Sequence, residues 1–275
     1  ADSHYFTIKS SDILSSPDYI IPMSKSSGDI IKRVFQNVPE LMDDLCNEVA
    51  AGIGTGGDKI FRISNTEAKA NLIEQDILRP LLIGREIHPY YVPAETGYSI
   101  IYATKAVSKI SHPNTLQYLM PFEDKLSQKR ETRKGLIPWW SLHWPRYPGL
   151  FQAPKIVLRQ TADTLCAAID SFGYYCLNSI IIVHPKNQNL LKYYVGLLNS
   201  RLMRWLYRNL TQEQSRVFAE VKPVNLRKLP IRQINFSSPA DKKSYDDIVS
   251  LVDIVMNIQK RKYENPGEQL SIDND

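Results

Sequence analysis

The chain has 275 residues and three cysteines, and 43% of its residues are hydrophobic and 23% charged. This composition indicates an ordinary globular protein that is long enough for a sizeable core. It contains no apolar run near the roughly 20 residues of a membrane-spanning helix. Cys46, Cys166 and Cys176 are odd in number and lack metal-ligand spacing, which favours reduced thiols in the cytoplasm over disulfides or a metal site.

The net charge of +5 hides an uneven distribution along the chain. Residues 125–159 hold eight basic side chains against one acidic, and residues 192–232 hold nine against two, so the remainder of the chain is acidic. Segregated positive segments favour a polyanionic partner. The alternative is that these charges lie on solvated helix faces without a partner.

The first distinctive stretch in chain order is GIGTGG at residues 52–57, which matches the glycine pattern of dinucleotide-binding folds. That pattern works where a strand enters the glycines and a helix leaves them. Here apolar residues four apart predict a helix within residues 28–50, and KIFRI at 59–63 predicts a strand. Because this order is reversed, we expect a structural turn whose Thr55 and Lys59 face a phosphate.

The remaining elements alternate neither as βαβ units nor as an all-β protein. Apolar alternation predicts strands at residues 98–104, 155–159, 165–170 and 179–183. Helical periodicity predicts helices at residues 113–132, 189–210 and 245–262. The predicted fold class is therefore α+β, a mixed sheet with packed helices, followed by C-terminal helices.

Composition divides the chain into four parts. They are an irregular lead-in over residues 1–26, a main domain over 27–235, a C-terminal helix over 236–263 and a disordered tail over 264–275. The C-terminal helix either docks against another domain or packs on its own domain, and the sequence favours neither. The chain begins without an initiator Met, and we expect it to be a piece of a longer protein.

Catalytic patterns are missing from the sequence, and recognition is the remaining interpretation. The five histidines are scattered without H-E-x-x-H, and neither G-x-S-x-G nor G-x-x-x-x-G-K-[ST] occurs. Residues 135–160 instead interleave aromatic with basic side chains, as base stacking and phosphate contact require. Within this segment we expect Trp139 and Trp144 in the core, and Arg146 with the basic run before it at the ligand.

Several stretches in order resemble the TaqI-like C-terminal specificity domain, the target-recognition domain of adenine-N6 DNA methyltransferases and type IIG restriction–modification enzymes. They are GIGTGGDKIFRI, LRPLLIGREIHPYY, YLMPFEDKLSQKR, PWWSLHWPRYPGLFQAPKIVLRQ, YYVGLLNSRLMRW and KPVNLRKLPI, which together span about residues 40–260. Each stretch is short, and their ordered occurrence carries the resemblance. The resemblance makes residues 27–235 the target-recognition domain and places the protein in a prokaryotic cytoplasm.

The same resemblance implies that this chain is not an enzyme by itself. The family's N-terminal methyltransferase domain carries the S-adenosylmethionine site and an (N/D)-P-P-(Y/F) motif that cradles a flipped adenine. The nearest string here, NVPE at residues 37–40, lacks the second proline and the aromatic ring. We therefore expect no cofactor in this chain. Its expected partners are double-stranded DNA and the methyltransferase domain of a parent chain, with or without an attached nuclease.

The resemblance assigns no base contacts, so the candidate DNA-binding residues follow from side-chain chemistry. Those expected along the duplex or on a phosphate are Thr55, Lys59, Arg130, Arg133, Lys134, Arg146 and Arg159. Residues 211–222 either read a groove through Gln212, Gln214 and Arg216 or form an ordinary polar loop. Two other functions stay open: a protein- or RNA-interaction module that uses the basic segments, and a complete small enzyme.

Overall fold

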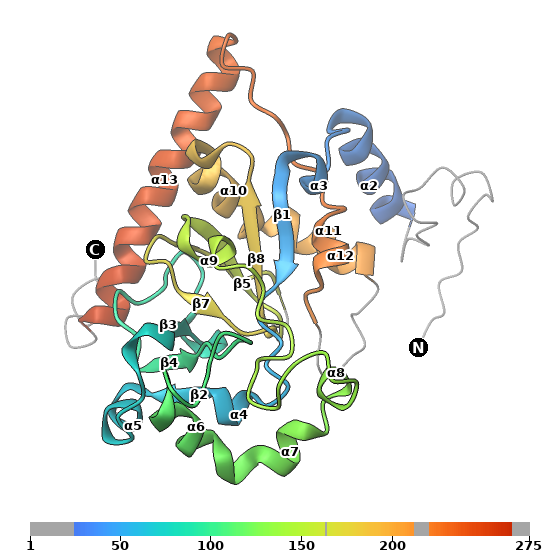
Figure 1. Ribbon diagram of the computed structural model, residues 1–275. Coiled ribbons are helices and arrows are strands. Elements are labelled where there is room, and N and C mark those ends of the chain that lie inside the picture. Colours follow the sequence, from blue (N-terminus) through green and yellow to red (C-terminus); the bar gives the residue numbers. More distant parts are fainter. Residues whose placement is uncertain (1–24, 163, 212–219, 266–275) are drawn as a thin grey trace, which may run out of the picture.

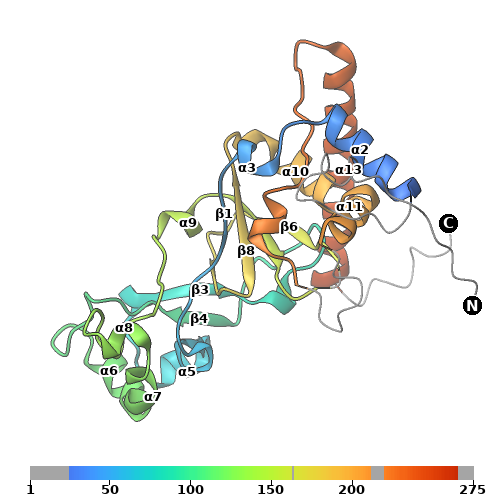
Figure 2. The same cartoon turned by 90° about the vertical axis from the view of Figure 1, so that its right-hand side faces the viewer.

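The computed structural model describes residues 25–162, 164–211 and 220–265. Two four-stranded sheets lie at its centre, and Figure 2 shows β1 and β8 of one sheet upright and β3 and β4 of the other running across the view. The strands are β1 (Cys46–Ala51), β2 (Arg62–Ser64), β3 (Leu78–Leu82), β4 (Tyr98–Ile101), β5 (Lys155–Arg159), β6 (Ala167–Asp170), β7 (Tyr175–Cys176) and β8 (Ile180–Pro185).

Helices surround both sheets (Figure 1). The α-helices are α2 (Lys25–Asn37), α3 (Met42–Leu45), α4 (Asp58–Phe61), α5 (Asn65–Ala70), α6 (Pro113–Leu119), α7 (Glu123–Ser127), α8 (Arg130–Arg133), α9 (Gly149–Gln152), α10 (Leu191–Leu198), α11 (Arg201–Thr211), α12 (Pro223–Leu226) and α13 (Pro239–Glu264). Short 3-10 turns are η2 (Gln75–Ile77), η3 (Gly84–Glu86), η4 (Met120–Phe122) and η5 (Gln188–Leu190). No helix in the described part of the chain is long and apolar enough to cross a bilayer.

The first sheet has the strand order β1-β8-β5-β6, and every neighbouring pair is antiparallel. All six residues of β8 are buried, in keeping with the apolar run at residues 180–183 that begins the strand. Ile180 and Ile182 join one hydrophobic cluster, whereas Ile181 and Val183 join a second cluster on the opposite face. The sheet is therefore sandwiched between two cores, and each buried side chain of this kind contributes roughly 1.5–3 kcal/mol.

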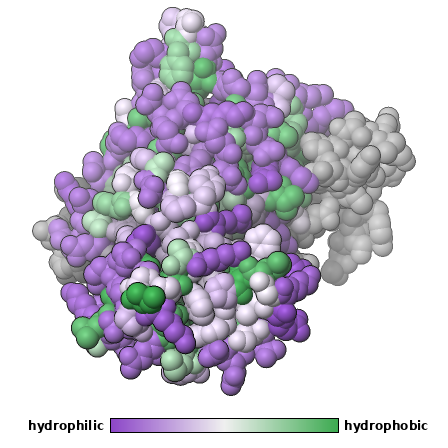
Figure 3. Space-filling view, in the orientation of Figure 1, coloured by the Kyte–Doolittle hydropathy of each residue, from purple (hydrophilic) through white to green (hydrophobic). Residues whose placement is uncertain are grey.

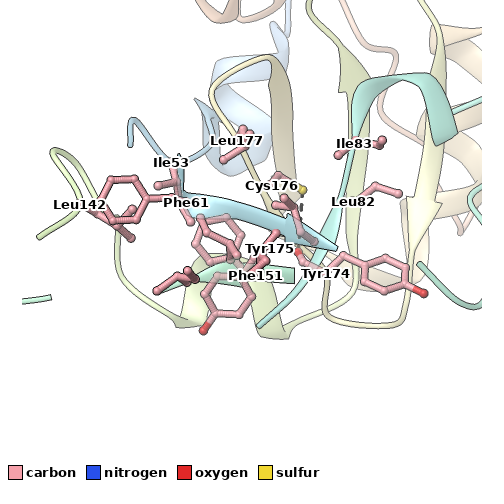
Figure 4. Packing of buried hydrophobic residues seen from close by; sticks show 14 of the residues in the cluster. Ile53, Phe61, Leu82, Ile83, Leu142, Phe151, Tyr174, Tyr175, Cys176 and Leu177 are labelled. Atoms are coloured by element: carbon pink, nitrogen blue, oxygen red, sulfur yellow. Dashed lines mark hydrogen bonds between the residues drawn. The ribbon is translucent and has the colours of Figure 1, made fainter. Parts of the chain in front are cut away.

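The second sheet has the order β2-β4-β3-β7. β4 is antiparallel to both β2 and β3, but β7 runs parallel to β3, with Leu81 beside Tyr175. Figure 4 shows Tyr174, Tyr175 and Phe151 in the cluster that this sheet shares with the first. Mixed strand directions and packed helices confirm the predicted α+β class.

A buried ion pair joins neighbouring strands of the first sheet where β5 begins and β6 ends. Lys155 and Asp170 are both fully buried, and Lys155 Nζ donates to Asp170 Oδ2 at 2.5 Å and to the Phe151 carbonyl oxygen at 2.6 Å. The carboxylate also accepts from the backbone N–H groups of Phe172 and Tyr174. The pair holds the turn that leads from the first sheet into β7.

The predicted helix within residues 28–50 is wrong beyond Asn37. α2 ends there, and after the short α3 the chain enters β1, which pairs with β8 over Cys46–Ala51. The four-residue apolar spacing does not produce a helix here because pairing with the buried β8 outweighs local periodicity. A strand therefore leads into the glycines and the short α4 leaves them, which is the opposite of the predicted order.

Two predicted long helices are interrupted, and each interruption has a visible cause. The helix predicted over residues 189–210 breaks at Asn199, whose buried side-chain amide pairs with both backbone polar groups of Ala167 at 2.8 and 3.0 Å. Ser200 then caps the start of α11. The helix predicted over residues 113–132 becomes α6, η4, α7 and α8, because Pro121 lies in η4 and Lys129 turns inward before α8.

The strand predictions fared better than the helix predictions. β5 has the predicted bounds, and β6 and β8 fall at the predicted places with shifted ends. The predicted strand at residues 98–104 ends at Ile101, and the one at 59–63 is α4 followed by β2.

α13 packs on its own domain through one of its sides. Val252 is buried against Gly196 of α10, and Lys192 of α10 forms an ion pair of 2.6 Å with Asp253. Figure 1 shows α13 lying along one side of the molecule over α10. The side of α13 that faces away from α10 is exposed.

Candidate nucleic-acid interface

The glycine segment 52–57 carries the chain from the first sheet to the second. Gly52 approaches the strand-end backbone so closely that a Cβ there would lie 2.3 Å from the Cys176 carbonyl oxygen. The Gly52 N–H donates to the Ile180 carbonyl oxygen, and the Ile53 N–H donates to the Cys176 carbonyl oxygen. The first glycine is therefore required for close packing between the sheets.

The same segment pairs with residues 142–146, and we call the two together the crossing. Gly54 and Trp144 exchange both backbone hydrogen bonds, at 3.1 and 2.7 Å, and His143 N–H donates to the Thr55 carbonyl oxygen. Below this pair, Ile53 and Phe61 pack with Leu142 in the buried cluster (Figure 4). The crossing is thus a rigid backbone platform over a packed core.

Four backbone N–H groups of the glycine segment are already occupied. Those of Gly52, Ile53 and Gly54 donate to backbone carbonyls, and that of Gly57 donates to the Thr55 hydroxyl at 2.9 Å. A nucleotide cradle needs such groups free to meet phosphate oxygens. The strand–glycine–helix order therefore does not make this the glycine-rich turn of a dinucleotide-binding fold, since β1 is antiparallel to its neighbour and α4 has only four residues.

Lys129 fixes α8 onto the crossing from the inside. This side chain is buried, and its ammonium donates to the carbonyl oxygens of Trp139, at 2.8 Å, and Ser141. Burial lowers the pKa of Lys129 from its ordinary value to about 8. Gly56 has φ +75°, and a Cβ on it would lie 2.6 Å from the Lys129 side chain, so this glycine makes room for the lysine.

Glu131 connects α8 to residues 142–146. Its carboxylate pairs with Arg130 at 2.7 Å and with the His143 ring. The acidic residue of this basic run is therefore turned toward the platform and engaged by Arg130 and His143, and its ion pairs in the described part of the chain do not include Arg133 or Lys134.

Exposed cations surround the crossing, and we call them the basic surface. They are Lys59, Arg130, Arg133, Lys134 and Arg146. Figure 3 shows hydrophilic residues gathered over α8 at the lower right of the molecule. Exposed lysine and arginine side chains on a rigid backbone are suited to contacts with phosphate oxygens.

Arg146 has a strained backbone held at two points. Its φ is +59°, a conformation that is uncommon for any residue other than glycine, asparagine or aspartate. Tyr102 Oη donates to the Arg146 carbonyl oxygen at 2.8 Å, and Arg146 Nε lies 3.4 Å from the Gly52 carbonyl oxygen. The chain thereby presents Arg146 at a fixed place between two exposed aromatic residues, Trp144 and Tyr147.

Two predictions for this region need correction. Trp139 is half-buried and packs against the core, as predicted, but Trp144 is 54% exposed. Thr55 is 1% exposed, and its hydroxyl donates to Asp58 and accepts from the Gly57 N–H, so this hydroxyl is buried in the turn and not exposed as the prediction requires. Pairing of the backbone with Gly54 holds the indole of Trp144 outside.

Arg159 lies in a different neighbourhood from the basic surface. It ends β5, is half-buried, and its guanidinium lies 3.6 Å from the Cys166 sulfur. A Cβ placed on Gly84 would lie 3.9 Å from the Arg159 side chain, so Arg159 lies beside η3. Gln212, Gln214 and Arg216 fall outside the described residues.

Sequence analysis missed a second basic feature, on the edge strand β2 and on η3. Arg62 and Arg85 each lie 5.6 Å from the centre of the Tyr98 ring, and Arg85 donates to the Tyr98 hydroxyl at 3.0 Å. The three side chains come from separate stretches that only the strand pairing brings together, so no local pattern announces them.

Metal chemistry finds no support in the described part of the chain. No group of three or more His, Cys, Asp and Glu side chains there is arranged to hold a metal ion. The cysteines Cys46, Cys166 and Cys176 are buried and reduced, as predicted.

Known proteins share this domain and this fold. The family model of the TaqI-like C-terminal specificity domain matches residues 79–231. The type IIL restriction–modification enzyme MmeI, solved in complex with DNA, aligns with a TM-score of 0.53 and 13% identity over 79% of this chain and 29% of that one. The type IIG restriction endonuclease BpuSI aligns with a TM-score of 0.49 and 13% identity over 83% of this chain and 28% of its own.

The chain spans less than a third of either solved structure. At 13% identity the likeness to MmeI shows a shared fold. The family match is stronger, because residues 79–231 are more than half of the 275 residues. The chain therefore belongs to the family of TaqI-like C-terminal specificity domains.

Proposed function

We propose that this chain recognises a specific sequence in double-stranded DNA for a restriction–modification enzyme and performs no catalysis by itself. The parent protein is an adenine-specific DNA methyltransferase, with or without nuclease activity. S-adenosylmethionine binds in its methyltransferase domain and not in this chain.

One observation supports this proposal most strongly: a member of a specificity-domain family presents exposed cations around a rigid crossing. Arg133 and Lys134 project from α8 while Lys129, four and five residues earlier, is buried under the same platform. Phosphate contacts of this kind fix the register of a protein on a duplex, and base contacts then read the sequence.

The interior of the crossing favours recognition over chemistry. The N–H groups of Gly52 and Gly54 are bonded to backbone carbonyls and that of Gly57 to the Thr55 hydroxyl, and the described residues contain no metal-holding group. MmeI, which shares the fold, was solved with DNA. Gln212, Gln214 and Arg216 have the side-chain chemistry to read adenine and guanine, and we assign them to base contacts.

Salt-dependent binding to labelled duplexes tests the role of the basic surface. Replacing both Arg133 and Lys134 with Ala removes two phosphate contacts, so affinity for all duplexes falls by a similar factor. The slope of log K against log salt flattens by roughly 1.8, since each contact contributes about 0.9. Fluorescence anisotropy at several salt concentrations measures both quantities.

A matched control removes the same charge from a distant surface. Lys242 and Lys243 are exposed on α13, and replacing both with Ala changes the net charge equally. We expect the salt slope of this variant to equal that of the wild type. Equal salt slopes for the wild type, the Arg133/Lys134 variant and the Lys242/Lys243 variant would remove α8 from the interface. Preferential binding to RNA or to an acidic protein would favour the interaction-module alternative.

A further inference from the structure

α13 carries a second apolar stripe that faces away from the domain. Leu251, Ile254 and Ile258 are 62%, 55% and 50% exposed, whereas Val252 on the opposite side is buried against α10. At 100° per residue the three exposed side chains fall within one narrow face of the helix. A soluble surface rarely places three large aliphatic residues in such a row without a partner.

The ends of this stripe carry opposite charges. Asp247 lies one turn before Leu251, and Arg261 lies one turn after Ile258, both exposed and on the same face. The ion pairs of α13 in the described part of the chain join Arg232 to Asp241, Lys242 to Asp246, Lys192 to Asp253 and Lys260 to Glu264. Asp247 and Arg261 lie outside these pairs.

The stripe is its own complement when it is reversed. Ile254 is seven residues from Asp247 and seven residues from Arg261, so it stands at the midpoint. An antiparallel copy crossing at Ile254 brings each Asp247 to an Arg261 of the other copy and each Leu251 close to an Ile258. A two-fold axis requires this kind of self-complementary surface.

We propose that α13 is the contact surface of a homodimer in which two copies of this chain cross antiparallel about Ile254. The stripe from Asp247 to Arg261 is about 21 Å long at 1.5 Å per residue. A contact of this length buries less than the 1,200 Å² or so of a standard interface, so the dimer is weak and exchanges. Two copies related in this way hold their basic surfaces at a fixed separation.

Sedimentation velocity of the whole chain over a concentration series tests the association. We expect monomer at low concentration and dimer appearing at tens of micromolar, roughly, as weak interfaces do. Ile254→Asp places two carboxylates at the axis and weakens association by at least about tenfold. A wild-type monomer at every concentration, or a dimer that Ile254→Asp leaves unchanged, would overturn the proposal.

A charge swap separates self-association from capture of any other partner. Asp247→Arg alone makes like charges meet in the homodimer and weakens it about three- to tenfold. Adding Arg261→Asp to the same chain restores opposite charges at both ends and returns the affinity to near the wild-type value. Failure of the double variant to recover would contradict the antiparallel register, and circular dichroism checks that each variant is folded.

Cysteine cross-linking reads out the register directly. The native cysteines are buried, and burial raises the pKa of Cys46 and Cys176 to about 12, so they stay unreactive. Ile254→Cys lies at the axis and forms a covalent dimer on mild oxidation. Ser244→Cys, exposed ten residues earlier on α13, is the control: two copies lie about 30 Å apart in the antiparallel dimer and do not cross-link. Cross-linking at both Ser244→Cys and Ile254→Cys would indicate a parallel arrangement, and no cross-linking at Ile254→Cys would remove it from the axis; either result would refute the proposal.

Discussion

The inside and the outside of this molecule use the same basic residue types for different purposes. Lys129 and Lys155 are buried and hold backbone carbonyls or a carboxylate in place. Arg133 and Lys134, in the same basic segment, are exposed on α8. The difference teaches that a count of positive charges in the sequence overstates the binding surface, because part of the charge stabilises the platform that carries the rest.

Breaking the buried Lys155–Asp170 ion pair has the largest expected effect on the stability of the protein. Asp170→Asn leaves the Lys155 charge uncompensated in the core and lowers the free energy of unfolding by about 3–5 kcal/mol. Urea denaturation measures the change. Adding Lys155→Met to Asp170→Asn removes the buried charge while the amide oxygen can still accept from the Phe172 and Tyr174 N–H groups, so part of that stability is expected to return. A single variant as stable as the wild type would show that the pair is dispensable.

The second-largest effect on stability is expected at Gly52, where the backbone lies close to the Cys176 carbonyl group. Gly52→Ala places a Cβ 2.3 Å from the Cys176 carbonyl oxygen, so the two sheets must shift apart at a cost of at least about 2 kcal/mol. Gly97 is the matched control, since a Cβ there meets nothing within 4 Å, and Gly97→Ala changes stability by less than about 0.5 kcal/mol. Thermal melting of both variants tests this difference. Equal melting temperatures for Gly52→Ala and Gly97→Ala would contradict the close approach at Gly52.

The lowered pKa of Lys129 predicts a specific dependence of stability on pH. Folded Lys129 loses its proton near pH 8, whereas an unfolded lysine keeps it to about 10.4. Between these values the unfolded state binds more protons, so the stability contributed by this site rises with pH. The wild-type free energy of unfolding minus that of Lys129→Met therefore increases from pH 8 to pH 10, by at most about 1.4 kcal/mol per pH unit. A flat difference would mean that Lys129 is not buried as described.

Replacing Arg146 has a small expected effect on stability. It therefore tests DNA binding by the exposed surface separately from folding. Arg146→Gly relieves the positive φ but loses a side chain, so stability changes by less than about 1 kcal/mol. Duplex DNA affinity is expected to fall several fold, because an exposed cation leaves the platform. A variant with unchanged affinity would exclude Arg146 from the interface.

Parts of the fold were predictable from the sequence because local pattern and tertiary environment agree. β5 was found with its bounds, and β6 and β8 fall at the predicted places with shifted ends. β1 was missed because its pairing with β8 is non-local and overrides a helical spacing. The break at Asn199 depends on the edge of β6, which no local window contains.

The candidate site was predictable in composition but not in burial. Arg130, Arg133 and Lys134 are exposed, in keeping with their assignment to the duplex, yet nothing in the run distinguishes Lys129 from them. The exposure of Trp144 follows from backbone pairing with Gly54 across the crossing. Arg62, Arg85 and Tyr98 meet only through the second sheet, so local patterns do not detect them.

Sequence-specific recognition is the central claim, and a binding selection tests it most directly. The purified chain is mixed with a library of randomised duplexes at low and moderate salt, and the bound DNA is sequenced. We predict an enriched motif of a few base pairs, because each mismatch at a read position costs roughly 1–3 kcal/mol. Salt-sensitive binding without any enriched motif, or no binding even at low salt, would contradict the claim that this chain reads DNA sequence by itself.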